Sequence, residues 1–214
     1  FFHIPEGGEF FLYSEDQSQI LGAFTEHSHK SHLGFSTSLI FSDTIILEYY
    51  EPHDVDFPGE INISSVIHGY KDISSRGYGD SEDCNNNVNC DNGQQWTDEI
   101  NSVVMILTQG GTRICTGFLV NNVREDFTPY LMTSQTCLGG HEDWIIMFNY
   151  ESIGCENEHG IIDETLSGTT LLDMGSTSDY ALLQISESPP EYYDVYFAGW
   201  DARDITPSNL VSIH

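Results

Sequence analysis

Three observations predict an all-β fold for this chain of 214 residues. Short runs of β-branched and aromatic residues alternate with turn-forming residues, as at Glu9–Tyr13 and Gln19–Thr25. The run Glu60–Ile67 alternates apolar and polar residues, which predicts a strand with one buried face. No stretch of useful length shows the periodicity of an amphipathic helix. A train of short strands with turn signals is typical of β-sandwiches and antiparallel barrels.

Residues 1–78 are predicted to form a small module of the β-sandwich or jelly-roll type. Besides the three runs named above, Phe35–Leu39 and Thr44–Tyr50 have the composition of strands. Residues 79–99 are predicted to be a junction, because the stretch 71–97 is rich in Asp, Asn, Ser and Gly. Such a stretch can hold calcium, but the D-x-D-x-D-G spacing is missing, and turns are the favoured interpretation.

The strands resume at residue 100, and residues 100–190 are predicted to form an antiparallel barrel. A hairpin turn is expected at Gln109–Gly111. The expected strands are Val103–Leu107, Arg113–Val120, Tyr130–Thr133, Trp144–Tyr150, Leu166–Leu171 and Tyr180–Ile185. Residues 191–214, with a last apolar run at Val195–Trp200, would begin a second barrel that they cannot close.

The charge excludes two classes of partner. Six Lys and Arg against 34 Asp and Glu give a net charge of −28, so there is no basic surface for nucleic acid or an anionic membrane. The acidic residues are spread along the chain, which indicates a solvated surface. No apolar stretch is long enough to span a membrane. The chain begins at Phe1 without a signal peptide, so we expect an excised or mature segment. We also expect no cofactor.

The five cysteines include no C-x-x-C pair. This usage favours an oxidising, extracellular location over a zinc site. An odd count means that one cysteine has no partner in the chain.

Several motifs together resemble one family. They are Cys84–Cys90, Ile114–Gly117 with Leu119–Asn122, Tyr130–Cys137, Phe148–Tyr150, Thr177–Tyr180 and Ala198–Asp201. In order and approximate spacing they resemble the secreted bacterial lysyl-endopeptidase-like serine proteases, a branch of the trypsin-like class with two β-barrels. The N-terminal module resembles the β-rich leader domain that precedes many such proteases, so the resemblance covers nearly the whole chain.

The resemblance implies a set of disulfides. It pairs Cys115 with Cys137, Cys90 with Cys155, and Cys84 with a cysteine beyond His214, which would account for the odd count. Spacing alone does not choose among the possible pairings.

The resemblance also assigns catalytic positions. A serine protease needs a serine that attacks, a histidine that relays the proton and a carboxylate that orients the histidine. The carboxylate position matches Asp179, but the histidine position, directly before Cys137, is Thr136. A threonine hydroxyl does not titrate near neutral pH and cannot relay the proton. The serine belongs to a G-x-S-G segment of the second barrel, and this chain contains no such segment.

Other candidate residues have simpler interpretations. His141 is the first candidate to replace the missing base, but we expect it on a loop and pointing to solvent. His27, His29 and His32 could suggest a metal site, yet their polar loop favours an exposed turn, and no metal site is predicted. Asn62 begins a formal glycosylation sequon within a strand pattern. A group of aromatic residues is expected in the core or at the barrel rim: Tyr192, Tyr193, Tyr196, Phe197 and Trp200.

The favoured hypothesis is a secreted, catalytically inactive serine protease homologue that acts as a structural, surface or binding module. Its partner would be a protein or peptide, for example within a surface complex or a filament. The alternative is an active extracellular endopeptidase whose nucleophile lies beyond residue 214. A third possibility is that the N-terminal module covers the barrel or assists its folding, with cleavage near Arg76–Ser81.

Overall fold

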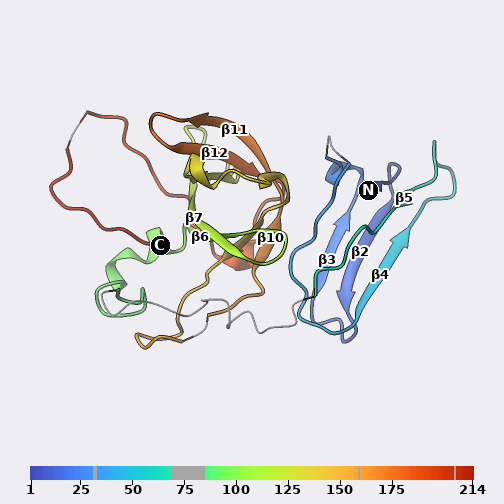
Figure 1. The fold of residues 1–214 in the computed structure, drawn as a ribbon, viewed down its shortest axis with the longest axis horizontal. Helices are drawn as coiled ribbons and strands as arrows, with labels where there is room; N and C mark the ends of the chain where they lie inside the picture. The colour runs from blue at the N-terminus through green and yellow to red at the C-terminus, as the bar shows by residue number, and fades with distance from the viewer. Residues whose placement is uncertain (31–32, 69–84, 159, 205) are drawn as a thin grey trace. The chain divides into compact units, whose positions relative to one another are not determined.

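The computed structural model describes residues 1–30, 33–68, 85–158, 160–204 and 206–214 (Figure 1). Strands are the main regular secondary structure of these residues, and the α-helix among them is one short segment, α1 (Thr97–Ile100). The prediction of an all-β fold is therefore confirmed. The chain divides into two compact units, Phe1–His68 and Gly69–His214. Within the described ranges, no helix has both the length and the apolar character needed to cross a membrane.

The first unit contains two small antiparallel sheets. Strand β2 (Glu9–Ser14) lies between β3 (Ile20–Phe24) and β4 (Ile45–Tyr50), and β1 (Phe2–His3) pairs with β5 (Glu60–Ile61). Alternate residues of β2 face inward, so the strand contributes Phe10 and Leu12 to a small core. The other buried members of this core are Phe2, Ile4 and Phe24.

Two predicted strands of the first unit are wrong. Phe35–Leu39 forms no strand, although Phe35 still enters the core and stacks on Phe2 with ring centroids 4.5 Å apart. The run Glu60–Ile67 forms a strand only over its first two residues, and its backbone hydrogen bonds to the segment of β1 end with Asn62, which bonds to Phe1. Alternation marks the residues that suit a strand, but a strand also needs a neighbouring edge with free hydrogen-bonding groups. Ile63 and Val66 are consequently exposed.

The second unit is built on one antiparallel sheet of seven strands in the order β10-β9-β6-β7-β8-β12-β11. Their bounds are β6 Val103–Leu107, β7 Arg113–Val120, β8 Tyr130–Thr133, β9 Ile145–Phe148, β10 Thr165–Ser167, β11 Thr169–Gly175 and β12 Tyr180–Ile185. The two edge strands, β10 and β11, are separated in the chain by Gly168 alone. One stretch of chain thus pairs with β9 at its start and with β12 at its end, and the sheet curls into a barrel (Figure 1).

The core of the second unit follows from the register. Leu119, Leu131 and Leu183 are direct neighbours on β7, β8 and β12, and all three are fully buried. Ile106 and Ile146 form a matching pair on β6 and β9. Trp144 closes the same cluster, with 1% of its surface exposed. The packing of these inward-facing side chains fixes β8 and β12, whose ends carry the site described below.

Two predictions for the second unit need correction. The expected strand Leu166–Leu171 is divided at Gly168, which has a φ of +86° and so takes a conformation that glycine adopts readily. The run Val195–Trp200 forms no strand. Only Ala198 makes a bridge, to Val120 of β7, and no further strand lies beyond it to complete a ladder among the described residues.

Candidate functional site

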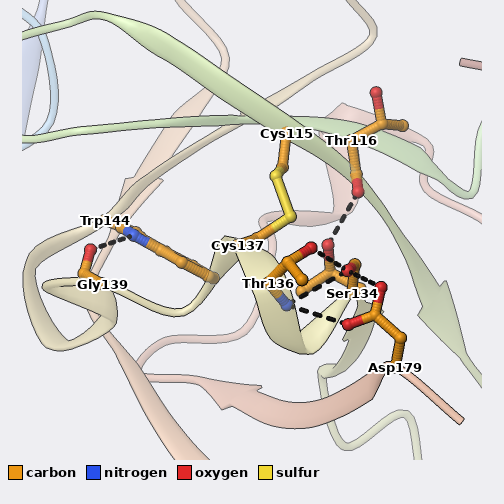
Figure 2. Close-up of a disulfide and its surroundings, with 9 residues drawn as sticks. Cys115, Thr116, Ser134, Thr136, Cys137, Gly139, Trp144 and Asp179 are labelled. Atoms are coloured by element: carbon orange, nitrogen blue, oxygen red, sulfur yellow. Dashed lines mark hydrogen bonds between the residues drawn. A yellow bond between two sulfur atoms is a disulfide. The ribbon is translucent and has the colours of Figure 1, made fainter. Parts of the chain in front are cut away.

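The structure brings Thr136 and Asp179 together. Thr136 lies in the short helix η4 (Gln135–Cys137), which follows β8, and Asp179 directly precedes β12. Because Thr133 at the end of β8 is paired with Ala181 near the start of β12, the two segments lie side by side (Figure 2). Thr136 and Asp179 are 43 positions apart in the sequence, and a hydrogen bond joins them.

Three groups from η4 and the residue before it bind the carboxylate and backbone of Asp179. The Ser134 hydroxyl donates to Oδ2 at 2.6 Å, and the Thr136 N–H donates to Oδ1 at 3.0 Å. The Gln135 N–H donates to the Asp179 carbonyl oxygen at 3.3 Å. The Ser134 and Thr136 hydroxyl oxygens are 2.6 Å apart (Figure 2). Asp179 thus uses both carboxylate oxygens to fasten η4 to the start of β12.

Hydrogen bonding keeps Asp179 ionised. The bond from the Ser134 hydroxyl, followed by that from the Thr136 N–H, lowers the pKa of the Asp179 carboxyl below its ordinary 3.8. Donors that bind the charged form favour it over the protonated form. Asp179 also has a φ of +48°, in the left-handed region that Asp tolerates better than most residues. The site therefore presents a fixed negative charge at the surface.

Ser134 was not singled out from the sequence. It is the N-cap of η4, and its side chain accepts the Thr136 N–H at 3.2 Å. A serine directly after a strand and before a short helix is a common capping residue. That signal predicts the cap, but the bond to Asp179 depends on the pairing of β8 with β12.

No imidazole takes the place of the missing histidine among the described residues. The hydrogen bonds that Asp179 accepts in this part of the chain come from Ser134, Gln135 and Thr136. His141, in η5 (His141–Asp143), packs edge-on against Trp144 with ring centroids 6.1 Å apart. Its Nδ1 is buried without a hydrogen-bond partner. The expectation that His141 points to solvent is wrong, because contact with Trp144 holds its ring partly buried.

Two disulfides support the site and its neighbourhood. Cys115 of β7 is bonded to Cys137 at the end of η4, so the helix that carries Thr136 is tied to the barrel wall (Figure 2). Cys90 is bonded to Cys155. These are the same two pairs that the family resemblance implies. Cys84 lies outside the described residues.

A groove of about 440 Å³ lies beside Asp179. Its apolar wall includes Val103, Phe118 and Met132, which are cross-strand neighbours on the outward side of β6, β7 and β8. Ser134, Asp179 and Glu99 also line it, and so do Ile213 and His214 of the C-terminal segment. Phe118 is 38% exposed, so part of its ring is open to the groove. The groove combines an apolar surface with an ionised carboxylate.

The other candidate residues are not assembled into a site. Within the described ranges, no three His, Cys, Asp or Glu residues are placed to hold one metal ion. His27 is exposed beside Glu26, whereas the His29 ring accepts a backbone hydrogen bond, and His32 is not described. Asn62 donates its side-chain amide to Glu60. Of the aromatic group, Tyr193 is buried in the core, whereas Tyr192 and Trp200 are exposed.

Three comparisons place the chain among known proteins. A family model described as "Lysyl endopeptidase, C-terminal domain" matches residues 78–214. The lysyl endopeptidase of Pseudomonas aeruginosa is 24% identical over 196 residues, which cover 80% of this chain and 41% of that protein. The chain therefore spans less than half the length of this relative. Among solved structures, human heparin binding protein gives a TM-score of 0.36 at 16% identity, over 52% of this chain and 48% of that one. Because the family model matches well over half of its residues, this chain belongs to the lysyl endopeptidase family.

Proposed function

We propose that this chain is an extracellular member of its family that has no peptidase activity and serves as a binding module for a protein or peptide. The observation that supports this proposal is that the Asp179 carboxylate is already engaged in hydrogen bonds. Its two carboxylate oxygens accept the Ser134 hydroxyl and the Thr136 N–H. Asp179, which matches the position of the catalytic acid in the family, thus fastens η4 to β12. Among the described residues, no imidazole is bonded to Asp179.

The chemistry of Thr136 explains the expected loss of activity. A general base must accept a proton from the nucleophile while a carboxylate orients it. The Thr136 hydroxyl lies 2.6 Å from the Ser134 hydroxyl, and it does not become a base near neutral pH. Removing the histidine of a serine protease lowers turnover by about 10⁶. An intact nucleophile elsewhere in a longer polypeptide would therefore gain almost nothing from this site.

The groove beside Asp179 is the proposed binding surface. Its cross-strand row of Val103, Phe118 and Met132 gives an apolar contact surface, and ionised Asp179 adds a negative charge to its lining. A net charge of −28 would steer a cationic partner toward the chain. The two disulfides are compatible with the oxidising conditions outside the cell.

The alternative function is an active endopeptidase with a different base. One observation favours it: His214 lines the same groove as Asp179 and Ser134. In this case His214, or His141 after a rearrangement of its loop, would relay the proton of a serine that lies beyond residue 214.

A turnover assay on the full natural polypeptide tests the proposal. Lysyl, arginyl and broad-range peptide substrates would be compared for the native protein, Thr136→His and the matched control Thr136→Ser, which keeps the hydroxyl. We expect no turnover by the native protein or by Thr136→Ser. Native turnover that is lost in His214→Ala or His141→Ala would establish the alternative and refute the proposal.

A further inference from the structure

His29 makes an unusual contact with the backbone of the first unit. Its Nε2 accepts the N–H of Ile4 at 3.0 Å. Ile4 follows β1 directly and is fully buried in the core. The His29 ring also packs edge-on against Phe2 of β1, with centroids 5.8 Å apart. One imidazole thus joins the start of the chain to the segment after η1 (Glu26–Ser28).

This contact requires the neutral ring. A ring nitrogen that accepts a hydrogen bond carries no proton, so the single proton of neutral His29 resides on Nδ1. The imidazolium form has donors only and has no lone pair for the Ile4 N–H. Protonation would therefore leave the N–H of Ile4, a fully buried residue, without its acceptor, and such a group is costly to leave unpaired.

The groups around His29 add to this effect. His3 of β1 faces it with ring centroids 5.0 Å apart and is itself stacked on Phe57 at 4.4 Å. Burial first, and then the proximity of His3, lowers the pKa of His29 below its ordinary 6.5, whereas Glu26 of η1 raises it. Glu26 is also paired with exposed His27 at 3.3 Å.

Other charged groups lie near the same segment. Glu60 of β5 is the register partner of His3, and the amino group of Phe1 donates to the Asn62 carbonyl. Lys30 is the next residue after His29 and carries a positive charge. A positive charge on His29 would arise close to the His3 ring and on the residue next to Lys30 in the sequence.

We propose that His29 is a pH-sensitive latch: its neutral ring holds Ile4 and β1 on the first unit, and its protonation releases them. Among the described residues, few other backbone hydrogen bonds hold this segment: the Phe2 N–H donates to the Leu33 carbonyl at 3.1 Å, β5 contributes a two-residue ladder, and Phe1 exchanges two bonds with Asn62. Release would expose Phe2 and Ile4, which are 2% and 0% exposed in the latched form. Acidification would therefore uncover an apolar surface on the first unit.

The direction of the pH dependence follows from linkage. A histidine whose pKa is lower in the latched form stabilises that form above the pKa of the free ring, near 6.5. The stabilisation declines as the pH falls below 6.5 and is lost once the pH passes the lowered pKa. Over this window the equilibrium constant for release rises by up to about tenfold per pH unit.

Amide exchange of the 214-residue chain by NMR tests the latch. Protection of the Ile4 amide, corrected for the intrinsic exchange rate, should be constant above pH 6.5 and should fall by up to about tenfold per unit below it. His29→Gln places a non-titrating amide oxygen near the position of Nε2, and its Ile4 protection should not depend on pH in this range. His27→Gln is the matched control, because His27 is 88% exposed and makes no bond to Ile4, and it should behave like the native chain.

Two results would overturn the proposal. One is a native Ile4 amide whose corrected protection does not change between pH 7 and pH 5. The other is the same loss of protection in His29→Gln as in the native chain. If His29→Gln does not fold, the ¹⁵N shifts of the native His29 ring decide the question: a neutral ring protonated on Nδ1 supports the latch, and one protonated on Nε2 contradicts it.

Discussion

Gly117 of β7 has no room for a side chain. A Cβ added there would lie 2.8 Å from Leu131 Cδ1, 3.1 Å from the Met132 carbonyl oxygen and 3.2 Å from Ile106 Cδ1. The first of these distances is shorter than real carbon contacts, and the surrounding core is fully buried. Gly117→Ala should therefore destabilise the second unit by about 1–3 kcal/mol through overpacking.

A second substitution shows whether Leu131 causes this cost. Leu131→Ala alone should cost about 2–5 kcal/mol, because Leu131 is fully buried and its loss leaves a cavity. In the double variant the Gly117→Ala methyl group occupies part of that cavity. The double variant should therefore be at least about 1 kcal/mol more stable than the sum of the single effects predicts.

Urea unfolding followed by tryptophan fluorescence measures all three variants, because Trp144 is buried in the same core. Gly199→Ala is the matched control, because nothing lies within 4 Å of a Cβ added there. It should leave the free energy of unfolding nearly unchanged, and its effect should add to that of Leu131→Ala. Additivity of Gly117→Ala with Leu131→Ala within about 0.5 kcal/mol would refute the packing described for β7 and β8.

Three further outcomes are expected. Replacing Cys115 and Cys137 together by Ala should lower the free energy of unfolding by about 3 kcal/mol, because the bond closes a loop across a separation of 22 residues; a loss below about 1 kcal/mol in the urea assay would contradict this. The Asp179 carboxyl should titrate below pH 3.8 by NMR, and Ser134→Ala should raise that midpoint, because Ser134 is the main donor that lowers the pKa. The stability gained from the ionised group is present above pH 3.8 and declines at lower pH. Burial raises the pKa of Tyr49 to about 12, so an ultraviolet titration should show a phenol ionising near pH 12 that Tyr49→Phe removes, and the associated stability should decline as the pH rises above 10.

The strands of the second unit could be predicted because their composition and their environment agree. Tyr180–Ile185 buries every second residue, and Val103–Leu107 is an apolar run that buries Val104, Ile106 and Leu107; the structure has both as strands. The division at Gly168 could not be predicted in the same way. It depends on one stretch of chain finding two different partners, β9 and β12, which is a property of the closed sheet.

The first unit shows the limit of local patterns. The alternation of Glu60–Ile67 correctly marks residues suited to a strand, but only β1 is available to pair with them, over two residues. The sequence suggests His29 only as a possible metal ligand together with His27 and His32. Its role as an acceptor for the Ile4 N–H depends on a contact across 25 positions, which no local pattern encodes.

The candidate site was predicted in part. The resemblance brought Thr136 and Asp179 to attention, and the structure places them 3.0 Å apart, from the amide nitrogen to Oδ1. The bond from Ser134 to Asp179 was missed, because serine is frequent at helix caps and its partner is 45 positions away. The bond depends on the pairing of β8 with β12, which places Ser134 next to Asp179.

Covalent labelling tests the central claim most directly. The full natural polypeptide would be incubated with a serine-directed fluorophosphonate probe and its intact mass recorded over time, beside an active trypsin-like protease. We expect no adduct on the native protein, because Thr136 supplies no base and Asp179 is bound to Ser134 and to the Thr136 backbone. Stoichiometric labelling of one serine would show an activated nucleophile and would contradict the proposal that this chain is a binding module without peptidase activity.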